Sequence, residues 1–289
     1  MRSTVDPVRL LAVDIDGTLL DSRGHLPEAH RMAMVDAWAA GIVVVLATGR
    51  AHHFAAPVSE ALGFPVAMIV NNGAVARAAS GETAVRHVVD RGVVRSILAG
   101  TRAFDDSVAL VFDRTDDRQI VFERMDWSHP QRSPYFRRNQ SFIARAVLDE
   151  ALDEDPIQVM FNGGVQPMRR LVAALRAMPL ASRFTVAITE YEARDFALVD
   201  VNGPGCSKGT TLARFAQILQ IPREQVMAVG DNLNDLEMLA FAGRPVVMGN
   251  AAEGMKGRGY PTVPGHDEDG LAVAIRRFAL GGSPTEPSD

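Results

Sequence analysis

Short, fully apolar runs alternate with amphipathic stretches along the first part of the chain. These runs are residues 8–13, broken only by Arg9, then 42–46 and 66–70. The stretches between them, 27–40 and about 51–62, carry helix signals, since Pro27 suits a first helical turn and Gly41 follows a helix end. Strands that are apolar on both faces are typical of a parallel sheet covered by helices on both sides. The pattern therefore predicts alternating parallel strands and helices.

From about residue 74 the pattern changes to short strand-like segments around polar turns. The flanking segments are 75–77 and 83–86 around Ser80-Gly81, and 107–112 and 119–122 around a polar turn at 113–118. Hairpins mixed with helices predict an antiparallel α+β unit, roughly 79–192, inserted into the parallel domain. The segment 126–156, rich in charge and proline, supports no assignment.

After Asp195 the first pattern returns. Strands are predicted at 196–201, 226–229 and 245–248, a helix at 207–220, and a loop followed by a helix at 231–242. The predicted fold class is α/β, with a parallel-sheet core formed by residues 1–78 and 193–280 and interrupted by an α+β domain at 79–192. The Gly-, Ser- and Pro-rich tail, 281–289, is predicted to be disordered.

Composition narrows the classes of function. Hydrophobic residues make up 47% and charged residues 22%, which is ordinary for a soluble protein. A net charge of -5 gives no basic footprint for nucleic acid, and no apolar run is long enough to suggest a membrane span. The single cysteine, Cys206, and the lack of an apolar leader near the N-terminus favour a cytoplasmic protein.

Two carboxylate pairs follow predicted strands. Asp14 and Asp16 end the first apolar run, and Asp231 and Asp235 follow the strand at 226–229. Turn chemistry also explains Asp16, and helix capping also explains Asp231. Together, however, the pairs bring four carboxylates to one sheet edge, where two charges 4 Å apart repel by ~4 kcal/mol at an effective dielectric near 20. Mg²⁺ prefers such oxygen ligands, so a magnesium site is expected.

Two further polar segments are predicted at the same edge. Thr48-Gly49-Arg50 follows a strand, where Thr48 could serve only as a strand-end hydrogen bonder. Lys208 lies at a helix start, where a solvated surface lysine is the simple alternative. A P-loop is excluded because Ser207, not glycine, precedes Lys208. The sequence suggests no Ser/His/Asp triad and no Cys/His pair.

These segments, in this order, resemble the four motifs of the haloacid dehalogenase-like hydrolases. The matching stretches are Asp14-Ile15-Asp16-Gly17-Thr18-Leu19-Leu20, Thr48-Gly49-Arg50, Lys208, and Gly230-Asp231-x-x-Asn234-Asp235. The long insert between the second and third motifs, and the segment 69–74 before it, resemble the Cof-type subfamily with a C2B cap domain. The resemblance covers about residues 8–280 and implies a Rossmann-like core.

The resemblance also implies roles for the acidic residues. Asp14 would be the nucleophile and a Mg²⁺ ligand. Asp16 would bind Mg²⁺ through its main-chain carbonyl, while its side chain protonates the leaving group. Asp231 would complete the metal site, and Asp235 would support it without binding the ion.

Four other matched residues would hold the substrate's phosphate. Thr48 and Gly49 from the second motif, Lys208 from the third and Asn234 from the fourth would bind phosphoryl oxygens. The expected function is a Mg²⁺-dependent phosphatase that hydrolyses a small phosphorylated metabolite, a sugar phosphate or similar, through an aspartyl-phosphate intermediate.

Alternatives remain at this point. The chain could be a phosphohexomutase-type phosphotransferase or a non-catalytic sensor of a phosphorylated metabolite. The only expected partner is a small phosphate ester, and the protein could be a monomer or a homodimer. Within the expected cap domain, Asn162-Gly163-Gly164 is a candidate substrate-facing loop, with a plain turn as its alternative.

Overall fold

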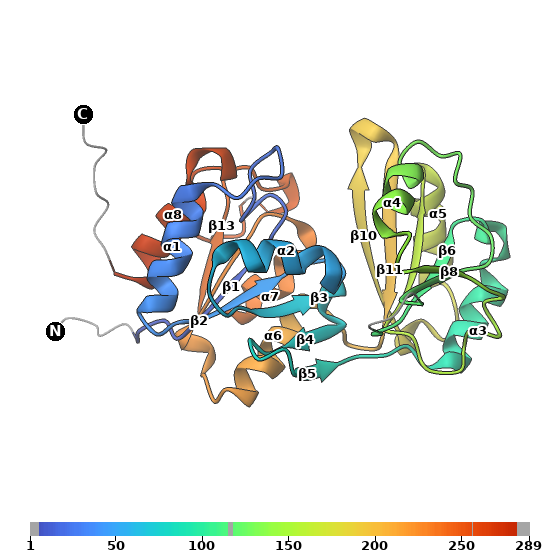
Figure 1. Cartoon of the computed structure of the whole chain (residues 1–289), viewed down its shortest axis with the longest axis horizontal. Helices are drawn as coiled ribbons and strands as arrows, with labels where there is room; N and C mark the ends of the chain where they lie inside the picture. The colour runs from blue at the N-terminus through green and yellow to red at the C-terminus, as the bar shows by residue number, and fades with distance from the viewer. Residues whose placement is uncertain (1–5, 115–117, 256, 282–289) are drawn as a thin grey trace. The chain divides into compact units, whose positions relative to one another are not determined.

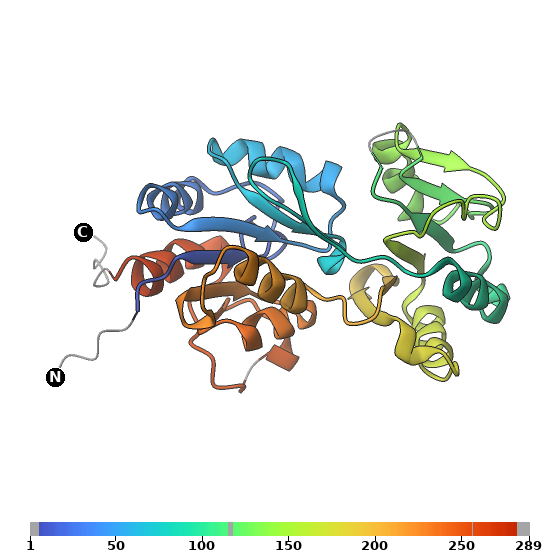
Figure 2. The same cartoon turned by 90° about the horizontal axis from the view of Figure 1, so that it is seen from below.

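The computed structural model describes residues 6–114, 118–255 and 257–281. The chain divides into two compact units, the core unit (residues 1–85 and 207–289) and the inserted unit (residues 86–206). Figures 1 and 2 show the chain in two views. Within the described ranges, no helix is both long and apolar enough to cross a bilayer.

The core unit is built on a seven-stranded sheet in the order β13-β12-β1-β2-β3-β4-β5. Its strands are β1 (Leu10–Val13), β2 (Val43–Ala47), β3 (Ala67–Val70), β4 (Val75–Arg77), β5 (Thr83–Arg86), β12 (Val226–Gly230) and β13 (Arg244–Val247). The first five strands in the spatial order are parallel, and β4 runs antiparallel to β3. The central strands are buried along their whole length, as their unbroken apolar sequences require.

Helices cover both faces of this sheet, α1 and α2 on one side and α6 and α7 on the other (Figure 2). The helices of the core unit are α1 (Glu28–Ala39), α2 (His52–Leu62), α6 (Lys208–Ile218), α7 (Leu236–Phe241) and α8 (Gly270–Ala274), the last continuing as a π-helical turn, Ile275–Ala279. Alternate strand residues such as Leu10 and Ala12 pack with Phe215 of α6 and Met238 of α7. With both faces covered, the ends of the strands are where polar groups can gather.

The inserted unit holds a six-stranded sheet in the order β10-β11-β9-β6-β7-β8. Its elements are α3 (Arg91–Gly100), β6 (Val108–Val111), β7 (Ile120–Phe122), α4 (Arg132–Asn139), β8 (Ile143–Arg145), β9 (Gln158–Gly163), α5 (Val165–Arg176), β10 (Thr185–Tyr191) and β11 (Phe196–Asn202). Only the pairing of β7 with β8 is parallel among the recorded pairings of this sheet. Helices α3 and α5 pack on one face, where Ile97 and Leu171 meet Phe161 of β9.

The predicted fold class, a parallel-sheet α/β core with an α+β insertion, is confirmed. The boundaries of the insertion differ from the predicted ones. The sequence placed them at 78/79 and 192/193, and the structure has them at 85/86 and 206/207. The hairpin of β4 and β5 extends the core sheet through β3. Strand β11 joins the antiparallel ladder of β9 and β10 rather than the core sheet.

The structure also assigns a segment of the inserted unit that the sequence left open, and it changes one further prediction. The unassigned segment 126–156 contains α4 and β8. Asn162 and Gly163 lie within strand β9, so they form neither the predicted loop nor a turn, and only Gly164 lies outside, at the N-cap of α5. The prediction for the tail 281–289 falls, beyond Gly281, outside the described residues.

Candidate active site

Four adjacent strand ends carry the residues that the sequence singled out. Strands β12, β1, β2 and β3 are neighbours in that order, and the chain leaves them at Asp231, Asp14, Thr48 and Asn71 respectively. Because the four strands are parallel, these ends meet at one edge of the sheet. The predicted convergence is confirmed for the three motifs that follow strands, at Asp14, Thr48 and Asp231.

Lys208 reaches this edge from the first turn of α6. Gly73 places that turn, since it has a φ of +102° and an added Cβ would lie 2.3 Å from the carbonyl oxygen of Ser207. Thr211 of α6 also donates a hydrogen bond of 2.7 Å to the carbonyl of Gly73. The helix is capped by Ser207, whose hydroxyl accepts from the amide of Thr210. Close packing between α6 and the turn after β3 therefore fixes where the lysine side chain starts.

The Lys208 ammonium bridges two carboxylates. Its Nζ donates to Asp14 Oδ1 at 2.6 Å and to Asp235 Oδ1 at 2.7 Å, and the lysine side chain is only 1% exposed. Of the 30 basic residues in the chain, Lys208 is one of only two lysines. A compact ammonium places its whole charge between two oxygens, which a planar guanidinium does not do. Lys208 is thus a buried side chain that pairs with two carboxylates, and the alternative of a solvated surface lysine is wrong.

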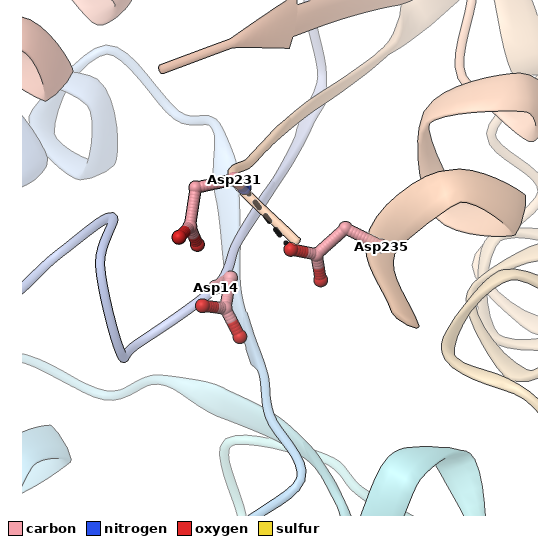
Figure 3. A group of neighbouring side chains, drawn as sticks. All are labelled: Asp14, Asp231 and Asp235. Carbon is pink, nitrogen blue, oxygen red and sulfur yellow. Dashed lines mark hydrogen bonds between the residues drawn. The ribbon is translucent and has the colours of Figure 1, made fainter. Parts of the chain in front are cut away.

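Asp235 organises the loop after β12. Its Oδ2 accepts from the amide of Asp231 at 3.1 Å (Figure 3) and from the amide of Asn232 at 3.0 Å. Its Oδ1 accepts from Lys208. Both carboxylate oxygens are therefore engaged by the protein itself. The residue holds Asp231 and Lys208 in place, and none of its oxygens is left without a donor.

Asp14, Asp231 and Asp235 form a carboxylate cluster, in which one oxygen from each lies within 4.8 Å of the others. Thr18 donates a hydrogen bond of 3.2 Å to Asp231 Oδ1. Gly17, with a φ of +85°, passes so close that an added Cβ would lie 2.3 Å from Asp231 Oδ2. Among the described residues, no donor engages Asp14 Oδ2. The cluster thus keeps free carboxylate oxygens beside a single ammonium.

The electrostatics of the cluster favour a cation. Burial raises the pKa of Asp14 well above its usual value and outweighs the lowering effect of Lys208. Burial, reinforced by the charge of Asp235, raises the pKa of Asp231 to about 7. Burial lowers the pKa of Lys208, but the charges of Asp14 and Asp235 outweigh it and hold that pKa above its ordinary value. Three buried carboxylates around one ammonium fit a divalent cation with oxygen ligands.

Three of the four residues expected at the phosphate, Thr48, Gly49 and Asn234, lie around Asn72. The Nδ2 of Asn234 donates to Asn72 Oδ1 at 3.1 Å, and the main-chain amide of Asn72 donates to the carbonyl of Thr48. An added Cβ on Gly49 would lie 3.0 Å from the same Asn72 oxygen. Thr48 is buried, and its hydroxyl oxygen accepts from the amide of Arg50 at 3.1 Å, which leaves the hydroxyl proton free to donate elsewhere.

Asp16 lies apart from the carboxylate cluster. Its two oxygens accept from Nε and Nη2 of Arg50, at 2.8 and 2.5 Å, in a bidentate pair. The Asp16 side chain is 62% exposed, and that of Arg50 is 28% exposed. The sequence prediction included Arg50 only as part of a motif and gave it no role. Thr18 and Asn72 were missed in the same way, because their partners lie far away in the sequence.

His30 of α1 anchors the loop that carries Asp14 and Asp16. The ring is buried, and its Nδ1 lies 2.9 Å from the carbonyl oxygen of Leu19. Burial lowers the pKa of His30 despite that hydrogen bond. The neutral ring therefore carries its proton on Nδ1, which is the only tautomer that can donate to a carbonyl.

Acidification is expected to destabilise the fold through His30. Because its pKa is lower in the folded than in the unfolded chain, the unfolded chain takes up the proton first as the pH falls below about 6.5. This contribution to stability is complete above that pH and is lost below it. Urea unfolding at pH 7.5 and 5.5 should show a larger drop in free energy for the wild type than for His30→Gln. An equal pH dependence in both would contradict the assignment.

A family model described as haloacid dehalogenase-like hydrolase matches residues 11–275. The chain belongs to this family. The sequence-based assignment to the haloacid dehalogenase-like hydrolases is therefore confirmed, and the match spans both units.

Individual relatives agree with the family assignment. Phosphatase YwpJ of Bacillus subtilis is 29% identical over 94% of this chain and 100% of its own length. The 5-amino-6-(5-phospho-D-ribitylamino)uracil phosphatase YcsE of the same organism is 26% identical over 96% of this chain and 98% of its own. A solved haloacid dehalogenase-like hydrolase from Bacteroides thetaiotaomicron superposes with a TM-score of 0.77 at 26% identity, over 94% of this chain and 99% of that one.

Proposed function

We propose that the chain is a Mg²⁺-dependent phosphatase that hydrolyses a small phosphorylated metabolite through an aspartyl-phosphate on Asp14. The observation that supports this most is the buried bridge from Lys208 to Asp14 and Asp235, beside the free Asp14 oxygen. Both similar Bacillus subtilis proteins are named as phosphatases, and the name of YcsE specifies a phosphate ester. A sensor would need a phosphate site but no nucleophile next to a free cation position.

Magnesium would be held by side-chain oxygens of Asp14 and Asp231, with the main-chain carbonyl of Asp16. Asp235 is assigned a supporting role, because both of its oxygens are already engaged. When bound, the ion supplies positive charge that offsets the negative charge on the phosphoryl oxygens. The raised pKa values of Asp14 and Asp231 support this assignment, since burial, reinforced by neighbouring carboxylates, makes their charged forms unfavourable and a bound cation would offset that cost.

The first half of the reaction forms the aspartyl-phosphate. Asp14 Oδ2 attacks phosphorus in line, so that a new P–O bond forms while the ester P–O bond breaks. The departing alkoxide takes a proton from the Asp16 carboxyl. The Lys208 ammonium and the hydroxyl of Thr48 donate hydrogen bonds to phosphoryl oxygens, and the backbone at Gly49 and the amide of Asn234 complete the phosphate contacts.

The second half hydrolyses this intermediate. The Asp16 carboxylate takes a proton from water, and the resulting hydroxide attacks phosphorus, which releases inorganic phosphate and restores Asp14. Arg50 holds Asp16 in the observed structure through an exposed pair, and exposed ion pairs are weak in water. Asp16 can therefore leave this contact to reach the substrate.

Release of inorganic phosphate tests the proposal directly. The full chain is incubated with sugar phosphates, nucleotides, pyridoxal 5′-phosphate and an aryl phosphate, with Mg²⁺ or with EDTA. Mg²⁺-dependent release is expected, and it should cease in EDTA. Conversion of a sugar phosphate into its isomer without free phosphate would replace the proposal with a mutase. Binding of an ester with no turnover would replace it with a sensor.

Replacement of Asp16 by Asn is expected to lower kcat by about 10²–10⁴-fold, the usual contribution of general acid–base catalysis. The loss should be smaller for formation of the aspartyl-phosphate from an aryl ester, since a phenolate leaves without needing a proton. Single-turnover kinetics with alkyl and aryl esters would separate these steps. Asp36→Asn, a change at an exposed acid on α1, serves as the matched control. Full activity of Asp16→Asn with an alkyl ester would exclude the acid role.

A further inference from the structure

The inserted unit contains a pocket of about 200 Å³, and the described residues that line it all belong to this unit. Its floor includes Ala109 of β6, Met160 of β9 and Leu198 of β11. These residues alternate along their strands with those that pack against α3 and α5, so the pocket lies on the opposite face of the sheet. The floor is apolar, and nothing in the proposed catalytic steps uses it.

Aromatic rings form the walls of the pocket. Trp127, Tyr191 and Phe196 all line it. The rings of Tyr191 and Phe196 are stacked with centroids 6.5 Å apart, and Trp127 meets Phe122 edge-on at 5.1 Å. Tyr191 is 43% exposed although it is large and partly apolar. Rings arranged in this way offer flat faces to a planar ligand.

One buried amide provides an oriented donor in this pocket. Arg132 Nε donates to Asn162 Oδ1 at 2.5 Å, and because arginine is only a donor, this contact fixes which end of the Asn162 amide is oxygen. Arg132 also donates to Ser107 Oγ at 3.2 Å and to the carbonyl of Asp126 at 3.0 Å. Asn162 is 6% exposed, lines the pocket, and has no acceptor for its Nδ2 within the described chain. A buried donor of this kind is stabilised by a ligand acceptor.

The charges and hydrogen-bonding groups of the lining limit the class of ligand that the pocket can bind. Arg194 lines the pocket and forms no ion pair or hydrogen bond with any described residue. Among the described residues, no aspartate or glutamate lines the pocket, and Asn162 Oδ1 is already engaged by Arg132. A sugar presents many hydroxyl donors, each of which needs an acceptor when it is buried. Apart from the side-chain oxygens of Gln131 and Tyr191, which can accept, the described lining supplies donors and apolar surface, so it offers a polyol few acceptors.

We infer that this pocket binds a planar heteroaromatic ring, with a ring nitrogen, carbonyl or phenolate oxygen accepting from Asn162 Nδ2 and Arg194. An engineered cavity of about 150 Å³ in another protein binds benzene, so a pocket of about 200 Å³ holds one substituted ring. If the proposed function holds, ring binding also assigns the substrate class. The preferred phosphate ester then carries a heteroaromatic alcohol rather than a sugar.

Binding without phosphate tests the pocket by itself. The chain has two tryptophans, so the full-length Trp38→Phe variant reports from Trp127 alone. Titration with pyridoxine, a substituted pyridine alcohol, should change Trp127 emission with saturation, and ribitol should not. Tyr191→Ala in the same background should weaken pyridoxine binding by about 2–10-fold, the usual worth of an aromatic pair. Tyr260→Ala, a change in the core unit, is the control and should leave binding unchanged.

Turnover provides the second arm. Tyr191→Ala should lower kcat/KM for pyridoxal 5′-phosphate by a similar factor, while kcat/KM for acetyl phosphate, which carries no ring, stays unchanged. Saturable pyridoxine binding without phosphate release from any ester would support the heteroaromatic pocket and contradict the proposed phosphatase function. Phosphate release with no Trp127 response to pyridoxine, and no effect of Tyr191→Ala on either ester, would keep the phosphatase and overturn the heteroaromatic assignment.

Discussion

Replacement of Asp14 by Asn is expected to abolish phosphate release while leaving the fold intact. The change removes the attacking oxygen but keeps the size of the side chain, so turnover should fall by roughly 10⁴-fold or more, since loss of a nucleophile in another hydrolase costs about 10⁶-fold. Burial raises the pKa of Asp14, which means that its charge is unfavourable in the folded chain. A neutral amide at this position should therefore cost little stability. Phosphate release and urea unfolding, measured together, check both parts.

Mass spectrometry sharpens this experiment. Wild-type protein quenched in acid during turnover should carry one phosphoryl group on the peptide that contains Asp14, and Asp14→Asn should carry none. Asp36→Asn, with an exposed acid changed, is the matched control and should behave as wild type. Turnover within about tenfold of wild type in Asp14→Asn would be inconsistent with a nucleophilic role, which is worth far more than tenfold.

The core unit could be predicted well because its strands are apolar throughout. Runs such as 42–46 have no polar face, so only a sheet covered on both sides buries them. Once those strands are parallel, Asp14, Thr48 and Asp231 must lie at the same edge, whatever the details of packing. The residues of the candidate site that follow strands could therefore be predicted from the sequence.

Contacts that depend on the direction of a side chain could not be predicted from the sequence. Asp16 and Arg50 pair over a separation of 34 residues, and Lys208 contacts Asp14 over 194. The position of α6 depends on the tight approach of Gly73 to Ser207, which no local pattern encodes. The resemblance to the family implied a supporting role for Asp235, but only the structure gives the hydrogen bonds to both of its carboxylate oxygens that support this assignment.

The inserted unit was predicted less well because its strands are short and the sequence does not determine which strands pair or in which register. The apolar run 196–201 fits a parallel core strand or an antiparallel strand equally well, and the structure has it in the antiparallel sheet. Asn162-Gly163 looks like a turn but continues β9, since its edge-to-edge pairing with β11 outweighs turn preference. The pocket floor depends on the register of β6, β9 and β11, which sets the alternate residues of the three strands on one face, and no local pattern encodes that register.

Replacement of Lys208 by Met is expected to lower both stability and activity. Met fills similar space without charge and leaves Asp14 and Asp235 buried without their cation. Loss of one partner from a buried charge group typically costs about 3–5 kcal/mol in the free energy of unfolding. Loss of a donor to the phosphoryl oxygens should lower kcat by about 10²–10³-fold as well. Urea unfolding in EDTA and phosphate release in Mg²⁺ measure the two effects.

Three further measurements test whether the stability loss comes from unbalanced charge. A second change, Asp235→Asn, removes one of the stranded carboxylates, and the double variant should be more stable in EDTA than Lys208→Met alone. The stability of Lys208→Met should also rise as the pH falls, because carboxyl groups with raised pKa values bind protons more tightly in the folded than in the unfolded chain. Added Mg²⁺ should restore part of the loss at neutral pH, where it supplies the missing positive charge. If neither the second mutation, acid nor Mg²⁺ recovers stability, Lys208 acts by filling space, and its proposed role at the phosphate loses its electrostatic basis.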